Sequence, residues 1–532
     1  MLLFYVNRLF AELPLYAGDE GAYLIRALYA RPLALDPERY RALQAVGNTA
    51  YFDLIRLVDL LSLNVVQWMR LLGAACYFGG LAMLYPLAVR EAGRTAALGA
   101  LLAAAAFPYY RFIFAAMPEG PYVGLLCLIV VTIHQTYLTR PLTGAVAVGA
   151  LSAVLVLIKP HGVAAALAFL ALSVGIGTWR GEQPWRVAVR LAMFLGAFLL
   201  VGGAIQLAAG EPPERAALFF TGSSFYAAQM SRALGPAALP MAALAAAGMS
   251  ALCAMFVAAP LTAWAASVLR DGRLRARNPT AGDIAVLFVV LALAASVAMV
   301  TVFAFKVSVS PGETRRIWGR YFEFFVPMLW LLSARPMEQW ASSARRVAAV
   351  IVAGGLGALM LVMSLGGVKL YPWDGTAMNA FAVDALPPLA ILATLAVSVV
   401  TATRFSTARA WTAYFVVLGL LSTRADDRWV GEIAARNARI EHELHMARSL
   451  TDDRHGEVLV VVDSLNDGHV AFLRLRGRPR VEVVGPGVVE PKLIGHATSL
   501  VAFGAHAPGP GWSKAFSGET LAVYVPQGGA GQ

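Results

Sequence analysis

The stretch Ile284–Phe305 reads IAVLFVVLALAASVAMVTVFAF and contains no charged side chain. A helix needs about 20 predominantly apolar residues to cross a hydrocarbon layer of roughly 30 Å, so this stretch predicts a membrane span. Backbone amide groups in lipid need internal partners, which favours helices over open strands. Three further stretches have the same character: Leu239–Val268, Val347–Leu365 and Leu386–Ala402.

The composition of the whole chain points the same way. Its 532 residues are 59% hydrophobic and 14% charged, and the mean hydropathy is +0.65. A soluble protein of this length cannot cover that much apolar surface, whereas a bilayer accepts it. Hydropathy and loop charge together predict about thirteen spans, of which the first is the partial segment Met1–Tyr16. The others begin near Val65, Thr95, Tyr122, Thr143, Val163, Val187, Leu239, Ile284, Phe322, Val347, Leu386 and Ala410.

Arginines are dense in alternate loops of this pattern. The positive-inside rule assigns these loops to the cytoplasm, so the N-terminus is predicted to be cytoplasmic and the C-terminal end periplasmic, in a multi-pass protein of the cell inner (plasma) membrane. The net charge of +11 does not indicate nucleic acid, because the basic residues lie in loops and not on one polar face. The loops carry Arg90 and Arg94; Arg140; Arg180, Arg186 and Arg190; Arg270, Arg273, Arg275 and Arg277; Arg335, Arg345 and Arg346; and Arg404 and Arg409.

The composition changes to that of a soluble domain from Arg424 onward. Asp426–Arg454 predicts a polar helix, and Glu457–Asp463 is a continuous apolar run typical of a buried strand. Short strands are predicted at Val481–Val484, Ser499–Phe503 and Leu521–Val525, between Gly- and Pro-rich turns. We therefore predict a membrane core over residues 1–423 and a small soluble α/β domain over 424–532.

Acidic residues stand at two of the outward-facing loops. Asp19 and Glu20 follow the first apolar segment, where partial desolvation can raise the pKa of a carboxylate and make it a general base. The alternative is a solvated helix start, since acids favour helix N-termini. Glu119, in the turn Met117–Pro118–Glu119, is either a second site residue or a cap of the fourth span.

Basic residues also end spans on this outward side. Lys159 and His161 lie at the outer end of the fifth span, where a lysine can also extend its amine to the interface without any further role. Arg111 follows Tyr109 and Tyr110 at the outer end of the third span, as in an interfacial aromatic belt.

The strongest basic signal is the loop before the tenth span. Arg315, Arg316 and Arg320 lie there with Tyr321, on the side where the charge rule disfavours arginine. Guanidinium groups bind phosphate oxygens through paired donors, so the loop predicts an anionic ligand. The alternative is an ordinary basic interfacial loop.

Taken in order, these motifs resemble the GT-C superfamily of membrane glycosyltransferases, which includes the aminoarabinose and protein O-mannosyl transferases. The resemblance covers the membrane core through Pro327 and implies a GT-C-like helical fold. The partial first span departs from the family pattern. The motifs that carry the resemblance are Gly18-Asp19-Glu20, Met117-Pro118-Glu119, Lys159-Pro160, and Arg320-Tyr321 followed by Pro327.

The resemblance implies a sugar donor linked by phosphate to a polyprenyl lipid, and a lipid, glycan or protein acceptor. In this scheme Asp19 takes the proton of an acceptor hydroxyl, which attacks the anomeric carbon with inversion. Glu20 or Glu119 orients a substrate, or one of these three acids holds a divalent cation, Mg or Mn, if one is used. The implied donor-phosphate ligands are Lys159, Arg315, Arg316, Arg320 and Tyr321, with Arg111 and His161 in second rank.

Two other functions remain open on the sequence. A transporter or flippase of lipid-linked sugars usually has related halves and ionisable residues deep in its spans, whereas these spans are nearly free of charge. An O-antigen ligase or polymerase would favour a long periplasmic loop between late spans, and the loops here are moderate. Polar residues gathered at one surface favour chemistry at the interface.

Overall fold

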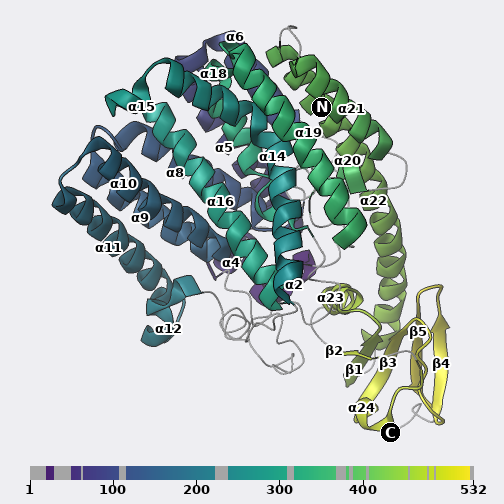
Figure 1. Cartoon of the computed structure of the whole chain (residues 1–532). Coiled ribbons are helices and arrows are strands. Elements are labelled where there is room, and N and C mark those ends of the chain that lie inside the picture. The colour runs from purple at the N-terminus through teal and green to yellow at the C-terminus, as the bar shows by residue number, and fades with distance from the viewer. Residues whose placement is uncertain are drawn as a thin grey trace.

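The computed structural model describes residues 19–28, 49–61, 64–106, 115–221, 238–307, 317–366, 375, 379–382, 387–402, 407–452, 456–475, 479–484 and 487–527. Figure 1 shows a bundle of helices beside a small domain that contains the C-terminal sheet. Within these residues, seven helices are long and apolar enough to cross a membrane. The expected class, a polytopic helical membrane protein with a small C-terminal domain, is confirmed.

The main helices begin close to the positions expected from hydropathy. They are α5 (Val65–Ala92), α6 (Arg94–Ala106), α8 (Glu119–Thr136), α9 (Pro141–Ile158), α10 (Val163–Arg180), α11 (Pro184–Ala208), α14 (Ala238–Arg270), α16 (Ala281–Val307), α19 (Ser342–Gly366) and α21 (Pro387–Ala402). Shorter elements are α2 (Asp19–Leu28), α4 (Thr49–Leu61), η1 (Pro160–Gly162), α12 (Pro213–Ala217), η2 (Phe219–Thr221), α15 (Arg273–Ala276), η4 (Gly319–Tyr321), α17 (Phe325–Leu332), α18 (Ala334–Glu338) and α20 (Asn379–Ala382).

Local sequence explains several of these helix ends. Proline stands at the first position of α9 and α11, where its missing N–H is not needed and its fixed φ suits the helix. Gly181 ends α10 with a φ of 68°, a left-handed conformation that glycine adopts without steric cost. At the start of α5, the side chain of Asn64 accepts a hydrogen bond from the backbone N–H of Gln67.

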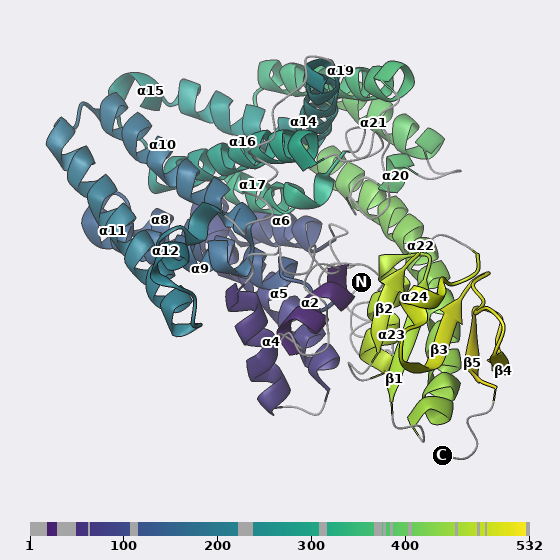
Figure 2. The ribbon, with the colours of Figure 1, turned by 90° about the horizontal axis from the view of Figure 1, so that it is seen from below.

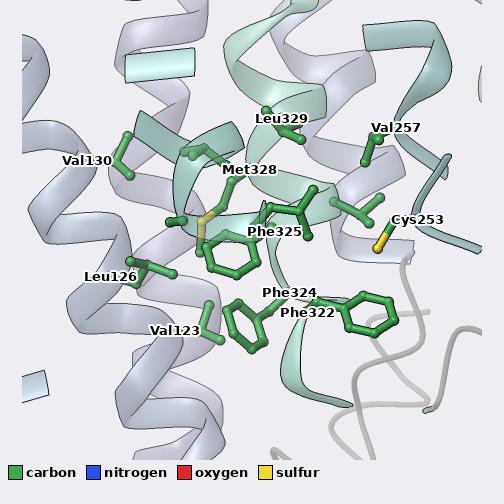
Figure 3. Packing of buried hydrophobic residues seen from close by; sticks show 14 of the residues in the cluster. Val123, Leu126, Val130, Cys253, Val257, Phe322, Phe324, Phe325, Met328 and Leu329 are labelled. Atoms are coloured by element: carbon green, nitrogen blue, oxygen red, sulfur yellow. The ribbon is translucent and has the colours of Figure 1, made fainter. Parts of the chain in front are cut away.

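The span expected near Phe322 differs from the others. It consists of η4, α17 and α18, and α17 has only eight residues, too few to cross a bilayer alone. All residues of α17 are buried, because its sequence is apolar on every side. Figure 3 shows Phe324 and Phe325 facing Val123 and Leu126 of α8, so this segment packs inside the bundle.

The C-terminal domain has a five-stranded sheet in the order β2-β1-β3-β5-β4. β1 (Glu457–Val462) is parallel to both β2 (Arg480–Val483) and β3 (Ala497–Phe503), while β5 (Leu521–Pro526) is antiparallel to β3 and β4 (Trp512–Ser517). Helices α23 (Leu465–Arg474) and α24 (Pro491–Ile494) complete the small α/β domain. Four strands match the prediction; β4 escaped it because none of its residues is fully buried and its sequence, WSKAFS, has no continuous apolar run.

Bundle and domain are joined by one continuous helix, α22 (Thr407–Asp452), of 46 residues. Such a helix is roughly 70 Å long, and in Figure 1 it runs from the bundle to the sheet. The last expected span and the expected polar helix are therefore parts of a single helix. The position between Thr423 and Arg424, at which the sequence predicts a domain boundary, lies inside it.

The bundle has two distinct ends. We call the end with α2, α4 and α12, next to the C-terminal domain, the domain side, and the opposite end with α15 the far side (Figures 1 and 2). Several arginine-rich loops meet on the far side. Three contacts join them: Arg335 pairs with Glu91 at 3.6 Å, Arg270 donates to Gln339 at 2.8 Å, and the Trp179 indole donates to the Leu274 carbonyl at 3.2 Å.

Candidate functional site

The site is framed by an unusually close contact between α5 and α8. A Cβ added at Gly120 would lie 2.4 Å from the carbonyl oxygen of Gly73, and one at Gly124 would lie 2.7 Å from that of Cys76. Only small residues let two helix backbones approach so closely. The contact holds the first turn of α8, which carries Glu119, beside Arg70, one turn before Gly73 on α5.

Glu20 and Arg70 form a buried ion pair on the domain side. Arg70 Nη2 lies 3.2 Å from Glu20 Oε1 and 3.3 Å from Oε2, and the backbone N–H of Ala116 donates to Oε1 at 2.7 Å. Glu20 is fully buried and Arg70 nearly so. Both carboxylate oxygens are thus engaged, and Glu20 ties α2 to α5 and to the turn before α8.

Arg70 was not predicted from the sequence, although its charge within an apolar stretch indicated a special role. It is the one charged residue in the first turns of a largely apolar helix, at a depth where a charge needs a partner. Breaking a buried pair by removing one partner is strongly destabilising, because the other charge is left uncompensated. A lone charge in an apolar span was therefore a candidate for this site.

Glu119 and Lys159 form a second buried pair on the same side. Lys159 Nζ lies 2.6 Å from Glu119 Oε1, and both side chains are less than one-tenth exposed. Lys159 follows the last residue of α9, where the tight turn η1 begins; a Cβ at Gly162 would lie 2.7 Å from the Val156 nitrogen. The second oxygen of Glu119 has no hydrogen-bond partner among the described residues.

The ring of Tyr321 brings three predicted basic residues together. Lys159 Nζ lies 4.7 Å from the ring centroid, and the His161 ring centroid lies 5.2 Å from it. Arg320 Nη2 donates to the Tyr321 hydroxyl at 3.0 Å. Lys159, His161, Arg320 and Tyr321, which the sequence predicts as phosphate ligands from two distant segments, therefore form one cluster.

Several buried polar atoms near these pairs lack partners within the described part of the chain. They are the hydroxyls of Tyr51 and Tyr122, Glu119 Oε2 and His161 Nε2. Burial raises the pKa of Tyr51, and the negative charges of Glu119 and Glu20 add to this, so the phenol lies within electrostatic range of both carboxylates. Buried polar groups are normally satisfied, so these four atoms are candidates for hydrogen bonds to a polar ligand.

Four predicted site residues cannot be placed in this way. Arg111, Arg315 and Arg316 lie outside the described residues, and Asp19 is described only as the first residue of α2, without its side chain. Their predicted roles stay predictions.

The described side chains that could bind a metal ion do not form a metal centre. Among the described residues, no three His, Cys, Asp or Glu side chains group as ligands of one ion. Glu20 and Glu119 each face a cation instead. Because the side chain of Asp19 is not described, a divalent cation, Mg or Mn, held by Asp19, Glu20 or Glu119 stays a prediction.

An apolar cavity of about 660 Å³ lies between α14, α16 and α19. Its wall includes Cys253 and Val257 of α14, Val290 and Val297 of α16, and Ile351 of α19. Figure 3 shows Cys253 next to Phe322, the residue that follows Tyr321. The cavity therefore begins close to the cluster of Lys159, Arg320 and Tyr321 and is suited to an apolar chain.

No family model matches the chain, and no curated protein matches its sequence. Its structure nevertheless matches that of ArnT from Cupriavidus metallidurans bound to undecaprenyl phosphate, with a TM-score of 0.55 at 16% identity, over 99% of this chain and 97% of that one. The chain has the fold of ArnT. The GT-C-like architecture that the motifs predict is thereby confirmed. The apo state of ArnT matches with a TM-score of 0.49 at 17% identity, over 98% of this chain and 96% of that one.

Proposed function

We propose that this protein is a membrane glycosyltransferase that moves a sugar from a polyprenyl-phosphate donor to an acceptor hydroxyl. The observation that carries the proposal is the cluster of Lys159, Arg320 and Tyr321, beside the unsatisfied oxygen of Glu119 and next to an apolar cavity. A charged headgroup and a long apolar tail need such a pair of neighbouring environments. The ArnT fold over nearly the whole chain supports the same class.

In this scheme the basic cluster receives the donor phosphate. Arg320 offers paired N–H donors and Lys159 a point charge, and both are held against the Tyr321 ring. One cation about 4 Å from the phosphate interacts by at most about 4 kcal/mol at an effective dielectric constant of about 20. Because the charge on the phosphate grows as the sugar leaves, these contacts stabilise the transition state. Arg315, Arg316, Arg111 and His161 are proposed as further ligands.

The lipid tail of the donor would occupy the apolar cavity. Its walls come from α14, α16 and α19, and a polyprenyl chain is recognised only by apolar contact. The matched ArnT structure holds undecaprenyl phosphate, a lipid of this class.

We propose Asp19 as the general base. It takes the proton of the acceptor hydroxyl, whose oxygen forms a bond to the anomeric carbon while the bond to the lipid phosphate breaks on the opposite face, so the configuration inverts. Glu20 is engaged by Arg70 and the Ala116 N–H, which suits it to positioning rather than to proton transfer. The unsatisfied oxygen of Glu119 can accept a hydrogen bond from a sugar or acceptor hydroxyl.

We further propose that the domain side faces the periplasm, with the N-terminus in the cytoplasm and the chain in the inner membrane. The arginine-rich loops that meet on the far side support this orientation. An alkaline phosphatase fused after Gln532 should be active in a Gram-negative host, and a fluorescent protein at the same place should be dark. The reverse pattern would overturn the orientation.

The phosphate assignment is tested with the purified full-length protein in detergent. Lys159→Met should weaken binding of undecaprenyl phosphate, measured by native mass spectrometry, by about tenfold or more, because one charge-assisted contact is lost. Lys514→Met is the matched control, since Lys514 lies on β4 against Tyr524. Equal binding by both variants would contradict the assignment. Transfer is then assayed with a panel of undecaprenyl-phosphate-linked sugars; translocation of these lipids without transfer would favour a flippase.

A further inference from the structure

The helix that carries Asp19 and Glu20 is held between the bundle and the C-terminal domain. In Figure 2, α2 lies between α4 and α23, and contacts exist on both sides. Leu24 and Ala27 belong to an apolar cluster with Tyr51 and Met69 of the bundle. Ile25, the residue that follows Leu24, belongs to the core of the C-terminal domain, in a cluster with Ile440, Leu444, Val470 and Phe472.

The tightest of these contacts lies directly beside Glu20. A Cβ added at Gly21 would lie 2.9 Å from the Cβ of His469 on α23, closer than real Cβ atoms approach. His469 is buried, so its side chain has little room to withdraw. The domain thus touches the first turn of α2 without space for one extra methyl group.

Helix α23, which carries His469, is firmly attached to the rest of the C-terminal domain and to α22. Ion pairs join both ends of α23 to α22: Arg436 lies 2.8 Å from Asp467, and Arg474 lies 2.7 Å from Glu441. On α22, Glu443 accepts hydrogen bonds from the backbone N–H groups of the turn that precedes β5. Because α22 continues into the bundle, α23 is a fixed surface against which α2 rests.

We propose that His469 is a positioning residue of the transferase, which holds the start of α2 through Gly21 and so places Glu20 against Arg70 and the turn before α8, and with it the neighbouring residue Asp19. The C-terminal domain is then part of the catalytic apparatus and not a separate module. The proposal rests on the transferase function argued above. It assigns the domain to turnover and not to donor binding, since Lys159, Arg320 and Tyr321 lie on other elements.

Replacing Gly21 with alanine tests the contact. A merely structural contact predicts a lower Tm with kcat per folded enzyme unchanged, because the added methyl group would strain the packing of α2 against α23. We instead expect Gly21→Ala to lower kcat by about a hundredfold, the scale of an ångström-sized misplacement, with donor KM and undecaprenyl phosphate binding unchanged. The matched control is Gly431→Ala on α22, where a Cβ meets nothing within 4 Å.

A compensating variant completes the experiment. His469→Gly alone loses the contact with position 21 and should itself lower kcat with undecaprenyl phosphate binding unchanged. In Gly21→Ala combined with His469→Gly, the methyl group at position 21 takes the space that the histidine Cβ leaves, so the contact forms again and most of the lost kcat should be recovered. Wild-type turnover by Gly21→Ala, or no recovery in the double variant while undecaprenyl phosphate binding is intact, would overturn the inference. Absence of transfer by the wild type and by Gly431→Ala alike would overturn the proposed function itself.

Discussion

Two buried carboxylates at opposite ends of the bundle differ in how fully they are hydrogen-bonded. On the far side, Asp283 accepts from Trp264, Arg273 and Thr280, so that each oxygen has at least two donors at 2.7–2.9 Å. On the domain side, Glu119 has Lys159 on one oxygen and no described partner on the other.

The difference separates a structural carboxylate from one prepared for a ligand. Both residues stand in the first turn of an apolar helix, so the sequence around them looks alike. A saturated carboxylate has no capacity left for a substrate, whereas an unsatisfied buried oxygen is costly unless a ligand completes it. Of these two carboxylates, Glu119 is therefore the one with capacity to bind a ligand.

The largest expected effect comes from making the same substitution at each end. Asp19→Asn should lower transfer by at least about a hundredfold, the usual scale for loss of a general base, and should leave undecaprenyl phosphate binding intact. Asp283→Asn should keep transfer within about twofold of the wild type, because the far side takes no part in the chemistry. Initial transfer rates of the purified variants test this. Near-normal transfer by Asp19→Asn would move the base to another acid, and Glu119→Gln is then the next variant.

A smaller loss is expected when the charge at Arg320 is kept but its shape is changed. Arg320→Lys retains the positive charge and loses the planar pair of donors and the bond to the Tyr321 hydroxyl. We expect transfer to fall by about tenfold, and Arg320→Ala to fall further. Donor titrations of kcat and KM measure both variants. Equal activity of wild type and Arg320→Ala would exclude Arg320 as a phosphate ligand.

Stability should fall more when the carboxylate of the far side is replaced than when Glu119 is replaced. Asp283→Asn places amide hydrogens against the donors of Arg273 and Thr280, and should reduce the free energy of unfolding by about 2 kcal/mol. Glu119 has one oxygen without a described partner, so in Glu119→Gln the amide oxygen can still accept from Lys159 while the NH2 group takes the unsatisfied position. This variant loses the ion pair but opposes no donor, and should cost less. Thermal unfolding of the detergent-solubilised protein, with wild type as reference, compares the two Tm values. A lower Tm for Glu119→Gln than for Asp283→Asn would break the comparison.

The smallest effect is expected at Glu443 of α22, a carboxylate whose two oxygens both accept hydrogen bonds from the C-terminal domain. Burial opposes its ionisation, but hydrogen bonds from Thr520, Leu521 and Glu519 outweigh burial, so the pKa of Glu443 lies below its ordinary value. A folded-state pKa below the unfolded one stabilises the protein above the ordinary value of 4.5, and this stabilisation disappears as the pH falls through the lowered pKa. Tm measured from pH 7 to pH 3 should therefore fall less steeply in Glu443→Gln than in the wild type.

Part of the candidate site could be predicted from the sequence, because hydropathy and loop charge depend only on residues close together in the chain. Helix starts near Val65, Val163 and Ile284 follow from apolar runs alone, since a span is stabilised by its own composition in the bilayer. Lys159 and Arg320 were found because basic residues on the outward side disagree with the charge rule. The sequence placed these two residues on a common side, but their contacts with the Tyr321 ring were not predicted.

Other features depend on where distant segments come to lie. The sequence indicates that Arg70 needs a partner but not which residue it is. Arg70 comes to lie beside the first turn of α8 because small glycines let α5 and α8 touch. Tyr51 reaches the site from a third helix, α4. The need for glycine at position 21 arises from His469, a residue near the other end of the chain. Composition and hydropathy are properties of neighbouring residues, so the sequence by itself determined the spans, strands and loop charges. Ion pairs and close backbone contacts depend on side chains from separate helices meeting within a few ångströms, and only the tertiary packing decided those.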